Sequence, residues 1–419
     1  MAFFEVPFFW LFLSFYLIHH FVVFFLDRLN IKHSAKQQNV PKPFLDYINE
    51  SAFEKSKAYT IEKLEFGILS RVLTIPFFWF LIVLGLFNTF DAYAAHFGGL
   101  GTLSQSVLFC VLISGYFLLI GLPFRYYNTF VIEEKYGFNK MTIFLFVIDL
   151  IKTIVIGLIL GVPLLYAIFW FMKNAGGLWW FWVWLTIMGF QFFVAAVYPT
   201  VFAPIFNKFV PMKDENLKEK IETLAKKINF KMSGIFTIDG SRRSGHSNAY
   251  FAGFGKFRRI VLFDTILKQM EENELIAVLA HEMGHNVKKH ILKSMILSSA
   301  MMLIALYIMS LLINQQPFYQ SFNIATPSHH SALVIFAIAS ETFTFFLTPF
   351  LNLWSRKNEF EADRFSVQTT KEKSAMKTAL IKLSKENLSN LDPHPAYSFY
   401  HYSHPTVLER IRAIDDIPT

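Results

Sequence analysis

The sequence predicts a mainly α-helical protein, in which seven membrane-spanning helices carry a small α/β unit on the cytoplasmic side. Of 419 residues, 54% are hydrophobic, 17% are charged and 50 are phenylalanine, whereas soluble globular domains carry about 25% charged residues. The apolar residues gather in runs of twenty or more, and each run can cross roughly 30 Å of hydrocarbon as a helix. This composition excludes a disordered, collagenous or coiled-coil chain.

Seven apolar runs are long enough to span a bilayer. The first, residues 2–26, has no basic segment before it and no small-residue cleavage site after it, so we expect a membrane helix rather than a removable signal peptide. The other predicted spans lie at about 66–90, 102–124, 143–171, 178–206, 291–314 and 331–354.

The loops between these spans alternate in charge, which predicts their sidedness. The loops at 88–101 and 315–330 contain no Lys or Arg, whereas 207–290 and the tail from Arg356 are basic. The loop after the first span is basic too, with Arg28, Lys32, Lys36, Lys42, Lys55, Lys57 and Lys63. Basic residues collect in cytoplasmic loops. We therefore predict that the N-terminus lies outside and that both soluble segments lie on the cytoplasmic side.

The predicted organisation has four parts: 1–206 with spans 1 to 5, 207–290 as a first cytoplasmic segment, 291–354 with spans 6 and 7, and 355–419 as a second cytoplasmic segment. Because both soluble segments lie on one side, they can form one domain. Within the first segment we expect a helix at 214–230, short strands at 235–238, 250–254 and 260–263, and a turn at 239–241.

The net charge of +8, from 39 basic and 31 acidic residues, could suggest a nucleic-acid partner. In a membrane protein the same excess faces anionic lipid, so we expect membrane lipid and no nucleic acid as partner. The single cysteine, Cys110, lies inside an apolar run. An intramolecular disulfide and a cysteine-based metal site are therefore excluded.

The segment His281-Glu282-Met283-Gly284-His285 follows an apolar helical stretch with acidic residues at its start. Positions i and i+4 share a helix face, so both imidazoles can reach one Zn²⁺. Glu282 would then stand beside the open coordination position and could exchange a proton with an attacking water. By chance the pattern occurs in on the order of one per cent of chains this long. It is a strong indication of a metal site without being decisive.

A catalytic zinc site needs a third protein ligand, and the best candidate segment is Glu359-Phe360-Glu361-Ala362-Asp363, directly after the last span. If the last helix continues into the cytosol, Glu359 and Asp363 share a face and Glu361 points away. One of the pair could bind zinc while the other holds a histidine or arginine behind it. The alternative is a solvated acidic helix start.

HEMGH with a later EFEAD, inside a seven-span chain, resembles the type I CAAX prenyl proteases, integral-membrane zinc metalloproteases of the gluzincin type. Other segments that agree with this family are 131–140, 206–212, 239–254, 258–267 and 398–411. The resemblance implies a chamber enclosed by the helices, one Zn²⁺ per chain held by His281, His285 and Glu359, Glu282 as the catalytic acid and base, and Asp363 as a supporting carboxylate. Glu361 departs from the family, since many eukaryotic members have Gln there.

The resemblance also implies roles in substrate handling. Asn248-Ala249-Tyr250 resembles an edge strand along which an extended substrate is added as a further strand. His404 resembles the residue that steadies the scissile carbonyl, and Arg410 resembles an arginine that supports the site and pairs with Asp363. The alternatives are that Asn248 only ends a turn and that 403–406 only begin a helix.

The remaining ionisable residues carry weaker predictions. We expect His290 to point away from the metal, His246 to be a loop histidine, and His19-His20 and His329-His330 to be interfacial or on the outer side. Asp149 and Glu341 lie inside predicted spans. A carboxylate there is costly, so each should face a partner or a water-filled cavity.

The leading functional hypothesis is a membrane-embedded zinc endopeptidase that cleaves peptide or protein substrates near their C-termini or within membrane-associated proteins. The family enzymes remove a tripeptide after a prenylated cysteine, but relatives in organisms without prenylation must use other substrates. The alternative is a seven-span transporter or channel with a structural or vestigial metal site, which leaves the paired motifs unexplained. An inactive scaffold is disfavoured because every catalytic position is present.

The chain ends in Asp415-Asp416-Ile417-Pro418-Thr419, without a dilysine or KDEL-type signal, and it is compact for the family. We therefore favour a bacterial cytoplasmic membrane, with the endoplasmic reticulum membrane as the alternative.

Overall fold

Seven long apolar helices dominate the computed structural model, which describes residues 2–253 and 258–418. Their number agrees with the seven predicted spans. The helices are α1 (Pro7–Lys36), α2 (Glu50–Val83), α4 (Leu103–Tyr127), α6 (Ile143–Asn174), α7 (Trp179–Val197), α12 (His290–Leu312), and α14 (His329–Thr344) continued by α15 (Thr348–Thr370). The last residue of the predicted strand 250–254, and of the segment 239–254, lies outside the described residues.

Several helices differ from their predicted limits. Helix α2 begins at Glu50, well before the apolar run, because the Asn49 side chain caps it by accepting a hydrogen bond from the Ala52 amide at 2.8 Å. The predicted loop 88–101 is mostly the helix α3 (Leu86–Gly98). Short segments link the spans: η1 (Ala2–Glu5), η2 (Lys42–Phe44), η3 (Asn128–Glu133), α5 (Glu134–Tyr136), η4 (Gly176–Leu178), η5 (Tyr198–Phe202), α8 (Ala203–Phe206), α13 (Gln316–Gln320) and η8 (Phe345–Leu347).

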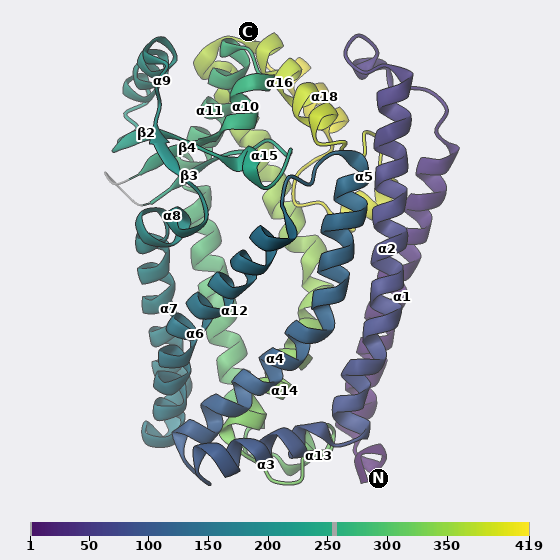
Figure 1. Cartoon of the computed structure of the whole chain (residues 1–419), viewed down its shortest axis with the longest axis vertical. Helices are drawn as coiled ribbons and strands as arrows, with labels where there is room; N and C mark the ends of the chain where they lie inside the picture. The colour runs from purple at the N-terminus through teal and green to yellow at the C-terminus, as the bar shows by residue number, and fades with distance from the viewer. Residues whose placement is uncertain (1, 254–257, 419) are drawn as a thin grey trace.

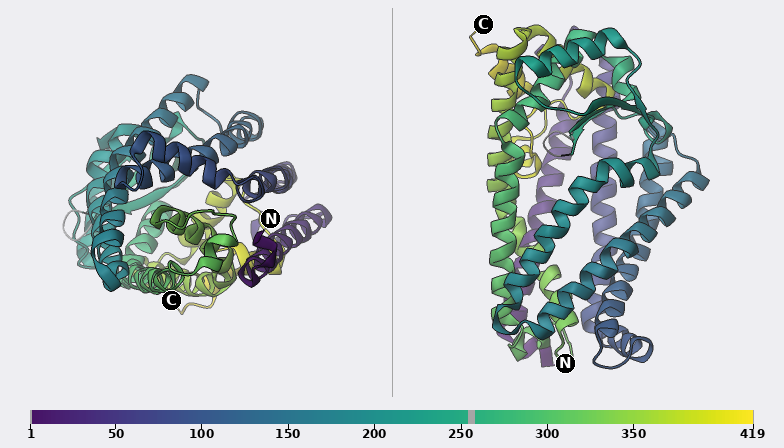
Figure 2. Two further views of the ribbon diagram at one scale, coloured as in Figure 1. Left: turned by 90° about the horizontal axis from the view of Figure 1, so that it is seen from below. Right: turned by 90° about the vertical axis from the view of Figure 1, so that its left-hand side faces the viewer.

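The membrane helices stand around the periphery of the molecule (Figure 2, left). Within their most apolar stretches only 11% to 28% of the residues are buried, so most side chains face the bilayer or the interior space. A cavity of about 460 Å³ lies between α1, α2, α4 and α14. This arrangement agrees with the expected bundle around a chamber.

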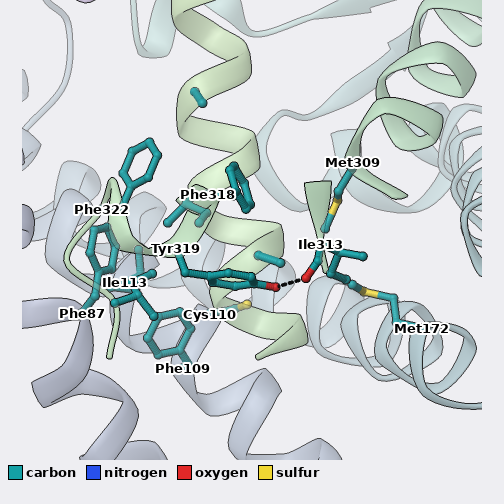
Figure 3. Close-up of a cluster of buried hydrophobic side chains, with 14 of the residues drawn as sticks. Phe87, Phe109, Cys110, Ile113, Met172, Met309, Ile313, Phe318, Tyr319 and Phe322 are labelled. Atoms are coloured by element: carbon teal, nitrogen blue, oxygen red, sulfur yellow. Dashed lines mark hydrogen bonds between the residues drawn. The ribbon is translucent and has the colours of Figure 1, made fainter. Parts of the chain in front are cut away.

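An aromatic cluster closes the end of the bundle that lies far from the sheet. Figure 3 shows Phe109 and Cys110 of α4 beside Phe318, Tyr319 and Phe322, which follow α12 in the chain. The Tyr319 hydroxyl donates a hydrogen bond to the Ile313 carbonyl at 2.6 Å. Burial of these rings fixes α3 and α13 across the lower end in Figure 1.

The soluble unit lies at the opposite end and contains a four-stranded sheet in the order β1-β2-β4-β3. Strand β2 is parallel to β4, and β3 is antiparallel to β4 with Ala249 opposite Leu262, so β3 is an edge strand. The strands are β1 (Phe209–Pro211), β2 (Gly234–Ile238), β3 (Ala249–Ala252) and β4 (Arg259–Phe263). Sequence analysis anticipated β2, β3 and β4 but missed β1.

The helices of this soluble unit come from the chain segments before α12 and after the last membrane span, and they lie at the same end of the molecule as the sheet (Figure 1). They are α9 (Glu215–Lys227), η6 (Gly240–Arg242), α10 (Asp264–Gln269), α11 (Glu272–Val287), α16 (Lys373–Glu386), α17 (Pro395–His401) and α18 (Val407–Asp415). Helix α11 packs closely on α15: the Ser366 hydroxyl donates to the Ala277 carbonyl at 2.6 Å, and a Cβ built on Gly284 would lie 2.9 Å from the Phe365 ring. Residues before and after the last two spans therefore form one unit.

Candidate metal centre

Helix α11 has one apolar face that packs in the core, and this packing determines where the HEMGH histidines point. Leu275, Leu279 and Met283 are buried in the core against the sheet. The helix begins at a capping box, in which Glu274 accepts a hydrogen bond from the Glu271 amide at 2.8 Å. This fixed start, together with the apolar face, sets the direction in which both histidines project.

Three side chains converge beside this helix. Nε2 of His281 lies 3.1 Å from Nε2 of His285. The two oxygens of Glu359, from α15, lie 3.2 Å from His285 Nε2 and 3.4 Å from His281 Nε2. These are the residues whose ligand atoms all lie within 4.8 Å of one another.

The cluster fits a zinc ion by its geometry and by its donor set. Tetrahedral ligands at about 2.0 to 2.1 Å from zinc stand about 3.3 Å apart, which matches the spacing of these atoms. Oxygen Oε2 of Glu359 is buried, and none of the described residues donates a hydrogen bond to it. Two imidazoles and one carboxylate form a ligand set found in catalytic zinc sites. Nη1 of Arg410 lies 3.8 Å from this buried oxygen, beyond hydrogen-bond distance, so the oxygen is free to bind a metal ion.

Asp363 lies behind the cluster, one helical turn after Glu359. Its Oδ1 is 2.8 Å from Nδ1 of His281, and Arg410 of α18 donates to both of its oxygens, at 2.8 and 2.6 Å. The shared face predicted for the two acidic residues of α15 is therefore observed, and so is the expected pairing of Asp363 with Arg410. Burial alone would lower the pKa of His281, but the neighbouring carboxylates of Asp363 and Glu359 outweigh it and raise the pKa to about 9.

Two further predicted residues lie at the edge of the cluster. Glu282 is partly exposed, and none of the described residues bonds to its carboxylate. His404, from the segment before α18, has Nε2 3.4 Å from Glu359 Oε1 and Nδ1 3.0 Å from the Ser403 hydroxyl. Its side chain is 64% exposed, which leaves it accessible to a ligand.

His290 is not one of the three clustered residues, but it contacts one of them, His285, which the helical spacing did not anticipate. Its Nδ1 lies 3.1 Å from His285 Nδ1, and its Nε2 lies 3.0 Å from Glu361 Oε2. Helical spacing failed here because α11 ends at Val287 and Lys289 adopts a φ of 59°, so the chain turns before α12 begins. Glu361 therefore contacts His290, and it is not part of the three-residue cluster.

The expected substrate strand is at the edge of the sheet. Ala249 and Tyr250 begin β3, and Asn248 immediately precedes it, with its carbonyl accepting a hydrogen bond from the Phe263 amide at 3.1 Å. Among the described residues no strand pairs with the other side of β3, so this edge could accept another extended chain.

The loop before β3 is held by residues that sequence analysis did not assign. His246 contacts Asn387 at 3.0 Å and Glu133 at 3.2 Å, and Arg243 donates to Asp149 at 2.8 Å. Glu133 belongs to the segment 131–140, which resembled the family without indicating a role. His246 is thus a bonded loop histidine, as expected. Asp149 was predicted to face a partner or a cavity, and the structure shows Arg243 as its partner.

Glu341, the other acidic residue inside a span, lines the 460 Å³ cavity together with His19, His20 and Arg71. This location agrees with the prediction that it faces a partner or a cavity. It also places the histidine pair of α1 inside the bundle, rather than at the membrane surface.

Comparisons with known proteins agree with this geometry. Residues 30–208 match the family described as CAAX prenyl protease N-terminal, five membrane helices, and residues 211–417 match peptidase family M48. A CAAX prenyl protease 1 homolog of Arabidopsis thaliana is 35% identical over 98% of both chains. CAAX prenyl protease 1 of Saccharomyces cerevisiae is 34% identical, covering 90% of this chain and 89% of the relative.

A crystal structure of Ste24p from S. mikatae superposes with a TM-score of 0.90 at 30% identity, covering 98% of this chain and 99% of that one. The similarity extends over the membrane helices and the soluble unit together, and it gives no support to a transporter or channel. The chain therefore belongs to peptidase family M48 and is a membrane metalloprotease.

Proposed function

We propose that the protein is a zinc endopeptidase in which His281, His285 and Glu359 hold one zinc ion. The observation that carries this proposal is the convergence of their ligand atoms around the buried, unbonded oxygen of Glu359. Asp363 fixes the ring of His281, and Arg410 holds Asp363 in turn. When bound, zinc would act as a Lewis acid and make water acidic enough to attack near neutral pH.

The chain supplies the proton transfers and the charge stabilisation. Glu282, partly exposed and with its charge near Arg410, accepts a proton from the attacking water and delivers it to the leaving amine. His404, exposed beside Glu359, donates a hydrogen bond to the carbonyl oxygen of the scissile bond as negative charge develops on it.

The substrate is a peptide or protein, and we propose that it binds as an additional strand along β3. Of the segment Asn248-Ala249-Tyr250, Ala249 would offer main-chain hydrogen bonds on the free side, because Asn248 and Tyr250 turn theirs towards β4. Binding would depend on backbone geometry more than on side-chain identity. The names of the relatives point to substrates that carry a prenylated CAAX sequence, and lipid of the surrounding membrane is the second expected partner.

The proposed topology places the N-terminus outside and the metal centre on the cytoplasmic side. Its support is the alternation of basic and non-basic loops. The bacterial cytoplasmic membrane remains the predicted location and the endoplasmic reticulum membrane the alternative, and in both cases the substrate would approach from the cytoplasm.

The test is cleavage of a peptide ending in an S-farnesyl-cysteine CAAX sequence beside its unprenylated twin, with products identified by mass and zinc measured in the same preparation. We expect about one zinc per chain and release of the C-terminal tripeptide. A zinc-loaded protein that cleaves neither peptide would contradict the proposed substrate class, and a fully folded protein that binds no zinc would contradict the proposed metal.

A further inference from the structure

Two cavities flank the metal centre and share one residue, Ile291 at the start of α12. The first, of about 430 Å³, contains the ligands His285 and Glu359. Its other walls carry the hydroxyl and amide groups of Ser294, Ser298, Ser355 and Asn358 beside Ile291 and Met295. The second, of about 480 Å³, lies between α7, η5, β3 and α11. Both cavities therefore begin next to the metal ligands but differ in chemistry.

The second cavity, here named the aromatic pocket, has Phe190, Ala195, Tyr198, Tyr250 and Phe251 among its lining residues. Four of these residues are aromatic. Among the described residues that line it, Arg258 is the one charged group, and its guanidinium lies 5.3 Å from the Phe230 ring centre. The volume is in the range of about 300 to 1,000 Å³ typical of pockets that enclose a small ligand.

The pocket also has a fixed framework. The π-helical segment η5 places Tyr198 and the buried Pro199 beside the sheet, and Arg259 donates to the Pro199 carbonyl at 3.4 Å. Tyr250 and Phe251 come from the strand β3. The wall after α7 is thus held to the sheet by a hydrogen bond, and the opposite wall is the strand β3 itself. Because both walls are fixed in this way, the pocket is a preformed site.

We infer that the aromatic pocket binds the isoprenoid group attached to the substrate cysteine. This inference rests on the proposed function, because only a substrate cut next to a lipid-modified residue brings such a group to the metal centre. The pocket shares Ile291 with the cavity that contains His285 and Glu359, and Tyr250 of the pocket lies on the proposed substrate strand, so the pocket adjoins both. A peptide lying on β3 could direct its modified cysteine into this pocket.

The first cavity, which contains His285 and Glu359, is the less suitable site for such a group. Placing an isoprenoid against Ser294, Ser298, Ser355 and Asn358 would remove water from these groups without replacing its hydrogen bonds, which is unfavourable. In the aromatic pocket the isoprenoid would leave water and contact rings and aliphatic side chains. The chemistry of the two cavities therefore assigns the lipid to the aromatic pocket.

The first experiment fills the pocket. Ala195 lines it, whereas the neighbouring Ala196 is exposed and does not. We expect Ala195→Trp to raise KM for an S-farnesyl peptide by at least about tenfold, because buried apolar contact is lost, and to leave cleavage of the S-methyl twin unchanged. The control Ala196→Trp should behave as wild type with both peptides, and zinc content verifies folding of each variant.

The second experiment enlarges the pocket. Tyr198→Ala removes an aromatic wall, so the ratio of kcat/KM for an S-geranylgeranyl peptide over the S-farnesyl peptide should rise by about threefold or more. An unchanged ratio here, or equal losses on both peptides in Ala195→Trp, would overturn the pocket assignment. A wild-type protein that cleaves neither peptide would instead refute the proposed function, so the two failures are distinguishable.

Discussion

Two histidine–carboxylate clusters lie at opposite ends of this molecule, and only one is suited to hold an ion. At the end far from the sheet, His330 of α14 has Nε2 2.8 Å from Asp91 and Nδ1 3.0 Å from the Ser106 hydroxyl. Gln105 donates to the same Asp91 oxygen at 2.7 Å. This cluster borders a cavity of about 690 Å³. In the metal centre, by contrast, His281 has one nitrogen on Asp363 and the other directed at His285 and Glu359.

The two clusters differ in the partner of the second ring nitrogen of the histidine. Both ring nitrogens of His330 are engaged by fixed partners in neighbouring helices, so the cluster links α3, α4 and α14. At the metal centre two imidazoles direct Nε2 to a common point, where the carboxylate of Glu359 also ends. A histidine beside an acid is thus a weak indication of a metal site, and convergence of free nitrogens is a strong one.

Removing a converging ligand should give the largest effect. We expect His285→Ala and Glu359→Ala to lose zinc and all measurable peptide cleavage. The matched change at the other end, His330→Ala, should retain zinc and activity while lowering Tm by a few degrees, about the effect of one lost buried hydrogen-bond link. Zinc analysis and a thermal scan measure these outcomes. Full zinc occupancy in Glu359→Ala would move the third ligand to Glu361 or Asp363.

Removing the proton carrier should separate chemistry from metal binding. Glu282→Gln keeps a side chain of the same shape, so zinc content should stay at the wild-type level. Its kcat should fall by about 10²- to 10⁴-fold, the usual contribution of a positioned general acid and base. Turnover near that of wild type would exclude Glu282 from the mechanism.

Removing the expected oxyanion donor should have a smaller effect that appears in one kinetic parameter. We expect His404→Ala to keep zinc and to change KM little, while kcat falls by about 10²- to 10³-fold. Steady-state kinetics on one peptide is sufficient. If KM rose and kcat stayed constant, His404 would bind the ground state and have no special part in the transition state.

The change with the smallest expected effect tests the close packing of α11 on α15. An alanine at Gly284 would place its Cβ 2.9 Å from the Phe365 ring, so α11 and α15 must move apart. We expect zinc affinity to fall by about tenfold, as for other changes that disturb the supports of metal ligands. Gly157→Ala is the control, because no atom lies within 4 Å of its added Cβ. Competition with a chelator measures both, and equal affinities would show that the packing tolerates a methyl group.

The sequence predicted the features that depend on local spacing. Long apolar runs revealed all seven spans, and the i, i+4 positions of His281 and His285 revealed the metal face. Spacing alone could not decide whether Glu359 or Asp363 is the third metal ligand, because the two residues share a helix face. The family resemblance pointed to Glu359. In the structure both lie as that resemblance implied, although the roles themselves await the experiments above.

Features that depend on a single turn or on distant pairing were not predictable. The contact of His290 with His285 depends on the positive φ of Lys289, which no periodic pattern reveals. The pairing of Arg243 with Asp149 joins residues far apart in the chain. His330 was expected at the outer side, but nothing in its neighbours indicated that Asp91 and Ser106 would meet it there.

The division of the metal centre along the chain has a consequence for biosynthesis. His281 and His285 precede the last two membrane helices, whereas Glu359, Asp363 and Arg410 follow or end them. A nascent chain in which α11 has been made still lacks Glu359, the proposed third ligand, and Arg410, the proposed support of the site. Complete active sites thus form only after the last helix hairpin has entered the bilayer, and until then a partly made protease cannot cut its neighbours.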